Sequence, residues 1–220
     1  MTADFFETIR KGDQEAVDEK LSADPSLLKT RQKDDLSPVL AAAYSGHPRL
    51  AEHLSEQVGA GELRLFEAAA VGDVAVVRGK LAGGWEIEDR SNDGYAPLHL
   101  AAYFGRLEVA RLLLERGADP NAVASNDSRV TPLHSAVSAR HRDLAGLLLA
   151  LGASANAVQK GGWTPLHSAA HNGDEAIVDL LLLRGADPTR PADDSRTPPD
   201  LADEAGYAAL ADMLRKAAQE

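Results

Sequence analysis

The chain has 220 residues with a formal net charge of −11, 44% hydrophobic residues and 26% charged residues. These fractions are close to those of ordinary soluble proteins, which excludes disorder over most of the chain. The chain contains no cysteine, which excludes disulfides, thiolate metal ligands and cysteine nucleophiles. The acidic balance argues against a nucleic acid or an anionic membrane as the main ligand, because both attract basic surfaces.

The amino-terminal segment contains no basic stretch followed by a long apolar run, so we expect no secretory signal. No apolar stretch approaches the roughly 20 residues that a membrane-spanning helix requires. We therefore expect a cytoplasmic protein with no membrane partner and no nucleic-acid partner.

A short phrase recurs along the chain. Its clearest copy is TPLHSAA at residues 164–170, related copies begin at residues 96 and 131, and a degenerate copy begins at residue 197. Successive copies are therefore 35, 33 and 33 residues apart. A fixed period of this size predicts a solenoid, in which each unit contacts only its neighbours.

Each phrase is followed by a turn, and the turn residue marks seven units. The equivalent turn positions are occupied by Gly12, Gly46, Gly72, Gly105, Arg140, Gly173 and Gly206. The predicted units span residues 1–34, 35–60, 61–93, 94–127, 128–160, 161–193 and 194–220. The first and last are expected to be capping units, because the ends of a solenoid need a polar outer face.

Each unit is predicted to contain two short helices around its turn. In the sixth unit, Thr164 is a predicted N-cap and Pro165 the first helical residue, where its missing N–H is tolerated. Asp174 is the predicted cap of the second helix, in which Ile177 and Leu181 contribute to an apolar stripe.

Departures from the period predict local differences. Only 26 residues separate Gly46 from Gly72, so we expect the hairpin between the second and third units to be absent. The 35-residue interval that ends at Arg140 predicts a longer, more mobile hairpin before the fifth unit. Because Arg140 stands where glycine is favoured, a different turn geometry is expected there. Ala96 replaces a capping threonine, at a cost of about 1 kcal/mol.

The phrase TPLHSAAHNGD, followed by a leucine-rich helix and by GADP at residues 185–188, resembles the ankyrin repeat. The resemblance covers nearly the whole chain and is weakest at its two ends. It implies an all-α fold, a solenoid of about seven stacked helix-turn-helix units with projecting β-hairpin loops, in a single domain over residues 1–220.

Seven histidines raise the question of a metal or acid–base site. His99, His134 and His167 occupy the same place in three successive phrases, and the resemblance implies a structural role, with bonds to the threonine hydroxyl and to neighbouring hairpin backbone. No GxSxG, P-loop or HExxH motif is present. We expect no catalytic residue, metal or cofactor, and an enzymatic role resting on His171 and Asp174 is the weakest alternative.

In ankyrin-family complexes, partners contact the hairpin tips and the exposed end of the first helix. Tyr and Trp at such positions favour binding, because these side chains dominate interface hot spots. Carried over to this sequence, the candidate partner-binding residues are Tyr95, Tyr103, Phe104, Ser138, Trp163, His171 and Asn172. For Tyr95 and Trp163, packing of the hairpin base is an equally good interpretation, whereas Trp85 and Phe66 are assigned to the core.

The resemblance therefore implies a non-catalytic module that binds a protein partner through the concave face and hairpin tips of units four to six. We expect a monomer whose acidic charge favours a partner with a basic face. A self-associating structural scaffold is the alternative. We also expect alanine at Tyr103 and Phe104 to abolish binding without lowering stability.

Overall fold

The computed structural model describes residues 2–32 and 35–219, and within these ranges it contains fourteen α-helices and no strand. The helices form seven consecutive pairs. The first helices of the pairs are α1 (Thr2–Lys11), α3 (Pro38–Tyr44), α5 (Leu65–Val71), α7 (Pro97–Tyr103), α9 (Pro132–Ser138), α11 (Pro165–Asn172) and α13 (Pro198–Glu204). The second helices are α2 (Gln14–Ala23), α4 (Pro48–Val58), α6 (Val74–Ala82), α8 (Leu107–Glu115), α10 (Arg142–Ala150), α12 (Glu175–Leu183) and α14 (Ala208–Ala217). Two short 3-10 helices are η1 (Pro25–Lys29) and η3 (Lys160–Gly162).

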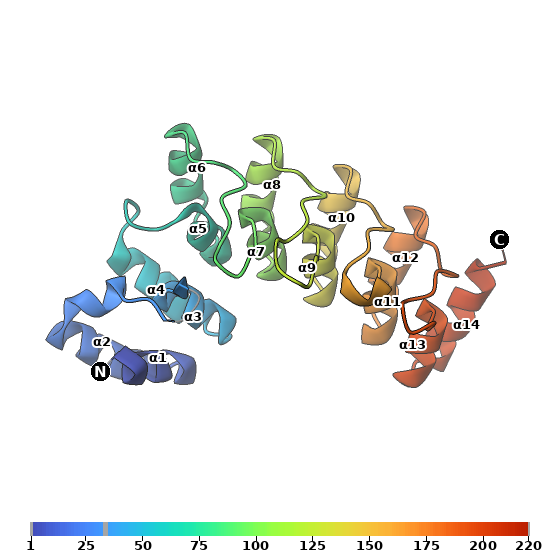
Figure 1. Cartoon of the computed structure of the whole chain (residues 1–220), viewed down its shortest axis with the longest axis horizontal. Helices are drawn as coiled ribbons and strands as arrows, with labels where there is room; N and C mark the ends of the chain where they lie inside the picture. Colours follow the sequence, from blue (N-terminus) through green and yellow to red (C-terminus); the bar gives the residue numbers. More distant parts are fainter. Residues whose placement is uncertain (1, 33–34, 220) are drawn as a thin grey trace.

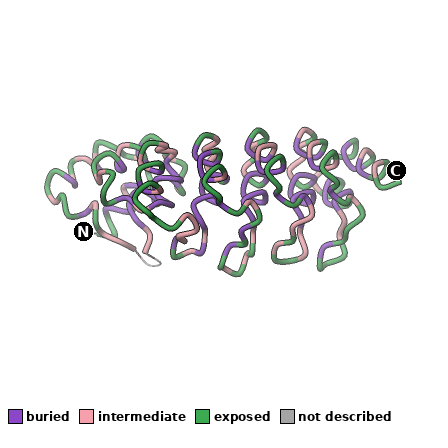
Figure 2. Tube along the Cα trace, turned by 90° about the horizontal axis from the view of Figure 1, so that it is seen from above, coloured by how far each residue is buried: buried purple, intermediate pink, exposed green. Residues whose placement is uncertain are grey.

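The pairs stack into an arch (Figure 1). The first helices lie on the inner, concave side of the arch, and the second helices of the later units lie on the outer side. The stack changes direction between α4 and α5, so the first two pairs form a separate limb. Loops between successive pairs project from one side of the stack (Figure 2).

The N-termini of the inner helices follow the expected local chemistry. In the sixth unit, the backbone N–H and the hydroxyl of Thr164 both donate to Nδ1 of His167, at 3.1 and 2.8 Å. Nε2 of the same ring donates to the carbonyl of Arg196 in the next hairpin, at 3.3 Å. Asp174 accepts from the backbone N–H of Ile177 and caps the second helix. The predicted structural role of the repeated histidine is therefore confirmed in this unit.

The turns between paired helices use left-handed backbone, and the expectation of a different geometry at Arg140 is wrong. Arg140 has φ 61°, close to the 69° of Gly105. A Cβ at Gly105 would lie 2.6 Å from the ring of His141, which covers this turn. Arg140 is tolerated in the same backbone conformation, and its guanidinium donates to the carbonyl of Asn172 at 2.8 Å.

The projecting loops are hairpin-shaped but too short to form strands. The loop before α7 closes with a bond from the N–H of Ser91 to the carbonyl of Tyr95. The loop before α9 closes between Ala124 and Val130, which is two residues longer, as predicted. Between α4 and α5, residues 59–64 form only a tight turn, so the hairpin is absent here, as expected. The bend of the arch falls at this shortened connection.

A ladder of side chains links the bases of the loops. The amide of Asn121 donates to the carbonyl of Gly152 and accepts from the N–H of Ser154, and Asn156 repeats this arrangement one unit later. Glu88 occupies the equivalent place in the third unit. Its Oε1 accepts from a backbone N–H at 3.0 Å, but its buried Oε2 has no hydrogen-bond partner in the described structure.

The hydrophobic core divides at the bend. One continuous cluster runs from the third unit to the last, and a second fills the first two units around Phe5 and Phe6. A small third cluster joins units two to four on the concave side and includes Leu40, Phe66 and Leu100. Phe66 is buried as expected, but Trp85 is not in the core: it is 41% exposed and lies against the ammonium of Lys80.

Candidate partner-binding surface

A pocket of about 450 Å³ opens on the concave side between the second, fourth and fifth units. We call it the inner pocket. It is lined by Tyr44, Asp93, Tyr95, His99, Leu100, Tyr103, Val130, His134, Ser135 and Ser138. Three of the predicted binding residues, Tyr95, Tyr103 and Ser138, therefore lie in one pocket. Its volume is within the range of about 300–1,000 Å³ that is typical of ligand-binding sites.

The pocket results from a change of side-chain size between two neighbouring helices. On α7, Leu100 and Tyr103 face the concave side, whereas Ser135 and Ser138 occupy the equivalent positions on α9. Helices α7 and α9 pack directly against each other. Equivalent positions of neighbouring repeats lie side by side in the stack. Small side chains on α9 beside large ones on α7 therefore leave a hollow.

Tyr44, at the end of α3, and Asp93, in the loop before α7, close one side of the pocket. Ala70 stands in the third unit where the second has Tyr44, and this small residue allows the tyrosine to reach the loop before α7. The Tyr44 hydroxyl donates to Oδ2 of Asp93 at 2.8 Å. The hydroxyl of Ser91 donates to Oδ1 of the same carboxylate. Burial, with the nearby Asp93 carboxylate, raises the pKa of Tyr44 far above its ordinary value, so the hydroxyl stays protonated.

Phe104 has a supporting role that the sequence did not indicate. Its ring packs between Tyr44, at 5.5 Å, and Tyr103, at 5.1 Å, and it also touches two hydrophobic clusters. Because of this packing, we expect that replacing Phe104 by alanine, alone or together with Tyr103, would lower stability. By contrast, Tyr103 is 48% exposed, which leaves about half of its side chain available.

The other predicted residues lie one unit further along. Trp163 stacks on His167 with ring centroids 6.1 Å apart and meets His171 edge-on at 5.9 Å. The Arg196 guanidinium lies 6.0 Å from the Trp163 ring. The carbonyl of Asn172 accepts from Arg140. These residues form a second patch and do not line the inner pocket.

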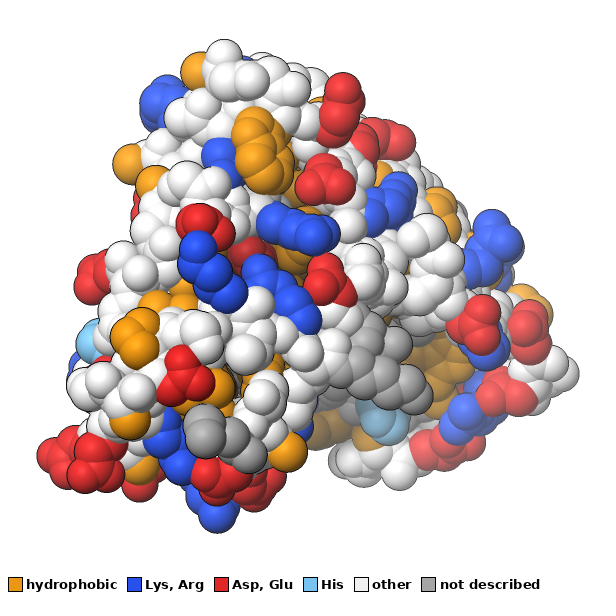
Figure 3. Space-filling model, turned by 60° about the vertical axis from the view of Figure 1, so that its left-hand side comes forward, with side chains coloured by type: hydrophobic (Ala, Val, Ile, Leu, Met, Phe, Trp, Pro, Cys, Tyr) orange, Lys and Arg blue, Asp and Glu red, His pale blue; other side chains and the backbone are white. Residues whose placement is uncertain are grey.

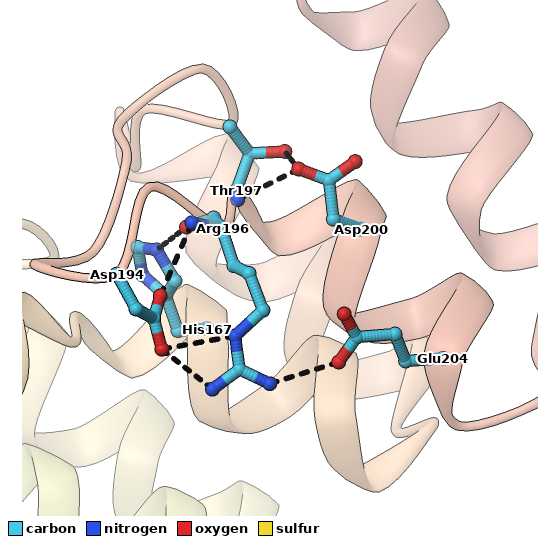
Figure 4. A network of polar contacts seen from close by, with 6 residues as sticks. All are labelled: His167, Asp194, Arg196, Thr197, Asp200 and Glu204. Atoms are coloured by element: carbon cyan, nitrogen blue, oxygen red, sulfur yellow. Dashed lines mark hydrogen bonds and ion pairs between the residues drawn. The ribbon is translucent and has the colours of Figure 1, made fainter.

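Two carboxylates hold the guanidinium of Arg196 in place (Figure 4). It pairs with Asp194 at 2.7 Å and with Glu204 at 2.8 Å. Because all of these side chains are partly exposed, the pairs contribute little to stability, but they orient the guanidinium against the indole. Trp163 therefore packs the base of its hairpin, and its exposed edge remains a candidate for partner contact.

The histidines of the inner pocket are neutral. Burial lowers the pKa of His99 and of His134 to about 4, although bonds to backbone carbonyls oppose this shift. Nε2 of His99 donates to Val130 at 3.1 Å, and Nε2 of His134 donates to Trp163 at 3.4 Å. Nδ1 of His134 accepts from the backbone N–H and the hydroxyl of Thr131. In the fourth unit, Ala96 supplies no hydroxyl, and the buried Nδ1 of His99 has no partner among the described residues.

Tyr44 and Asp93 also line the pocket. Both stand at repeat positions that correspond to partner contacts in ankyrin-family complexes, and Tyr44 occupies the same place in its unit as Tyr103 in the fourth. The sequence did not indicate that these two side chains meet. Their meeting depends on the shortened connection between α4 and α5.

On the face that Figure 3 shows, toward the amino-terminal limb, Lys and Arg side chains are interspersed with Asp and Glu. Within residues 2–32 and 35–219, no three His, Asp or Glu side chains gather closely enough to hold a metal ion. No helix in these ranges has the length and apolar character needed to cross a membrane.

Seven stacked helix pairs with projecting loops define a helical repeat solenoid. A family model described as ankyrin repeats, in three copies, matches residues 5–124 and 121–192. The chain therefore belongs to the ankyrin repeat family. Members of this family are generally protein–protein interaction modules and are typically non-catalytic.

Proposed function

We propose that this protein binds a protein partner through the concave surface of units four to six, centred on the inner pocket. The observation that carries the proposal is the exposure of Tyr103 and Tyr44, 48% and 39%, at the rim of an unfilled hollow. Tyrosine is one of the residue types that are enriched at interface hot spots, which often lie in or beside pockets. The patch of Trp163 and His171 extends the surface along the stack.

A stable complex would bury about 800 Å² on each partner, which requires more than one unit. The two patches together span units four to six, which meets this requirement. No catalytic residue is invoked, and the proposal leaves the partner's identity open. The alternative is that two copies associate through the same aromatic residues. It predicts a complex with twice the mass of the chain.

A photo-crosslinking amino acid placed at Tyr103 or Ser138 tests both possibilities in lysate of the native cell. The matched control places it at Leu183, which is 83% exposed at the end of α12. A heterologous adduct from the pocket positions but not from Leu183 supports the proposal. An adduct of twice the 23.3 kDa chain mass supports self-association. Equal adducts from all three positions would refute the choice of surface.

Substitution of Tyr103 alone is the appropriate loss-of-binding variant, because Phe104 also supports the fold. Tyr103→Ala should abolish the heterologous adduct at Ser138 and leave the thermal melt nearly unchanged. Retention of that adduct would remove Tyr103 from the interface.

A further inference from the structure

The side chains that line the inner pocket favour one kind of ligand side chain. We propose that it binds a positively charged side chain, lysine or arginine, presented by the protein partner. This inference rests on the proposed function and specifies the chemistry of its central contact. It is carried by three features of the pocket: its aromatic wall, its single carboxylate and the state of its remaining polar groups.

Three tyrosine rings line the pocket, those of Tyr44, Tyr95 and Tyr103. Each aromatic face carries a negative electrostatic potential that attracts a cation within about 6 Å of the ring centre. Such a contact is worth about 0.5–2 kcal/mol, with the larger values where water is excluded. Leu100 adds an apolar surface to the lining, and Tyr95 packs against the buried cluster of Leu40, Phe66 and Leu100.

The only charged side chain of the lining is Asp93. Its two oxygens accept hydrogen bonds from Tyr44 and Ser91, and its carbonyl accepts from the Asn126 amide at 2.7 Å, so the group is held in place. In the described structure, no Lys or Arg forms an ion pair with it. Arg90 lies close enough to His99 to help lower its pKa, but its guanidinium donates to the carbonyls of Gly94 and Val123. A fixed carboxylate that forms no ion pair, beside aromatic rings, is complementary to a cation that enters from outside.

The remaining polar groups do not oppose a cation. His99 and His134 both donate their Nε2 hydrogen to backbone carbonyls, and they carry no positive charge near neutral pH. Ser135 and Ser138 can each accept a hydrogen bond through the hydroxyl. An incoming ammonium or guanidinium therefore meets acceptors and aromatic faces, whereas an incoming carboxylate would meet Asp93.

The test uses the full chain and two acetylated pentapeptides in which a central arginine or its neutral isostere citrulline is flanked by glycines. Amide chemical shifts of the ¹⁵N-labelled protein report the site and the dissociation constant. We expect the arginine peptide to shift resonances of the inner pocket and to bind at least fivefold more tightly than the citrulline peptide. A lysine peptide is expected to shift the same resonances.

Two variants and a matched control locate the effect. Asp93→Asn keeps an acceptor for Tyr44 but removes the charge, and it should weaken arginine binding about tenfold. Asp127→Asn removes the same charge from the neighbouring hairpin, where the side chain is fully exposed and outside the pocket, and it should have little effect. Ser135→Leu fills the hollow with the residue that unit four already carries at this place, and it should abolish binding without unfolding the chain.

Equal binding of the arginine and citrulline peptides would overturn the cation proposal while leaving a peptide-binding surface, and so the proposed function, intact. Absence of any shift in the pocket with every peptide would also overturn it. In that case the crosslinking experiment still decides the proposed function separately.

Discussion

The N-cap of α7 tests how the repeated histidine is held. In the fifth unit, Nδ1 of His134 accepts from the hydroxyl of Thr131 at 2.9 Å. In the fourth, Ala96 replaces the threonine, and the buried Nδ1 of His99 has no partner in the described part of the chain. Ala96→Thr places a hydroxyl at this position. The backbone there has φ −73° and ψ 160°, in the same extended region as Thr131 with −101° and 168°, so the backbone conformation suits threonine.

The expected gain follows from two terms. Replacing alanine by threonine at an N-cap stabilises a protein by about 1 kcal/mol. Giving a hydrogen-bond partner to a buried acceptor contributes roughly 0.5–1.5 kcal/mol. Because both terms share one hydroxyl, we expect a total of about 1–2 kcal/mol. For a chain of this length, each kcal/mol raises the Tm by about 2–4 °C.

Urea unfolding followed by circular dichroism, with calorimetry for the Tm, measures this gain. Thr164→Ala is the matched reverse change in the sixth unit, because it removes the hydroxyl that donates to His167, and it should lower stability by about 1 kcal/mol. If Ala96→Thr gave no gain while Thr164→Ala gave the expected loss, the unpartnered nitrogen would not be a defect, and the reasoning would be refuted.

Three further predictions concern buried groups and the helix turns. Burial lowers the pKa of His99 and His134 to about 4, so the unfolded chain binds more protons below pH 6.5, and stability to urea should fall by roughly 2 kcal/mol per histidine at pH 5. Gly105→Ala, which places a methyl group 2.6 Å from His141 at φ 69°, should cost about 2–3 kcal/mol in urea unfolding. Glu88→Gln introduces an amide donor like those of Asn121 and Asn156 at the equivalent places of the next two units. It should raise stability in the same assay by about 1 kcal/mol.

Each of these predictions has its own control. Gly46→Ala has a similar φ of 79° but no described atom within 4 Å of the new methyl, so it should cost only about 1 kcal/mol; equal losses at the two glycines would exclude the clash with His141. Imidazole titration by NMR near pH 6.5 for the two buried histidines would contradict the acid prediction. A lower Tm for Glu88→Gln would show that the carboxylate is better accommodated than the amide.

The solenoid, its helix pairs and the role of its histidines could be predicted because they depend on local chemistry. Thr164, Pro165 and His167 lie within three residues of one another, so the N-cap forms wherever the phrase occurs. Loop lengths could also be predicted, since they follow from the spacing between phrases. The missing hairpin before α5 and the longer one before α9 are both as the intervals of 26 and 35 residues indicated.

Tolerance at single positions could not be predicted, because it depends on what lies across the stack. Arg140 adopts the same left-handed turn as the glycines around it, and only the position of the next unit shows that its side chain has room. Trp85 has a large hydrophobic side chain, which favours a place in the core, yet it lies at the surface against Lys80. Neither outcome is encoded in the neighbouring residues.

The sequence by itself determined the repeat, the concave face and the place of Tyr95, Tyr103 and Ser138 on it. Only the tertiary structure joined these residues to Tyr44 and Asp93 in one pocket. Tyr44 and Asp93 are 49 residues apart and meet because a missing hairpin, a bend in the arch and a small Ala70 bring α3 and the loop before α7 within hydrogen-bond distance. A periodic pattern specifies each unit, but a contact between elements that are not consecutive in the chain depends on the curvature of the whole stack.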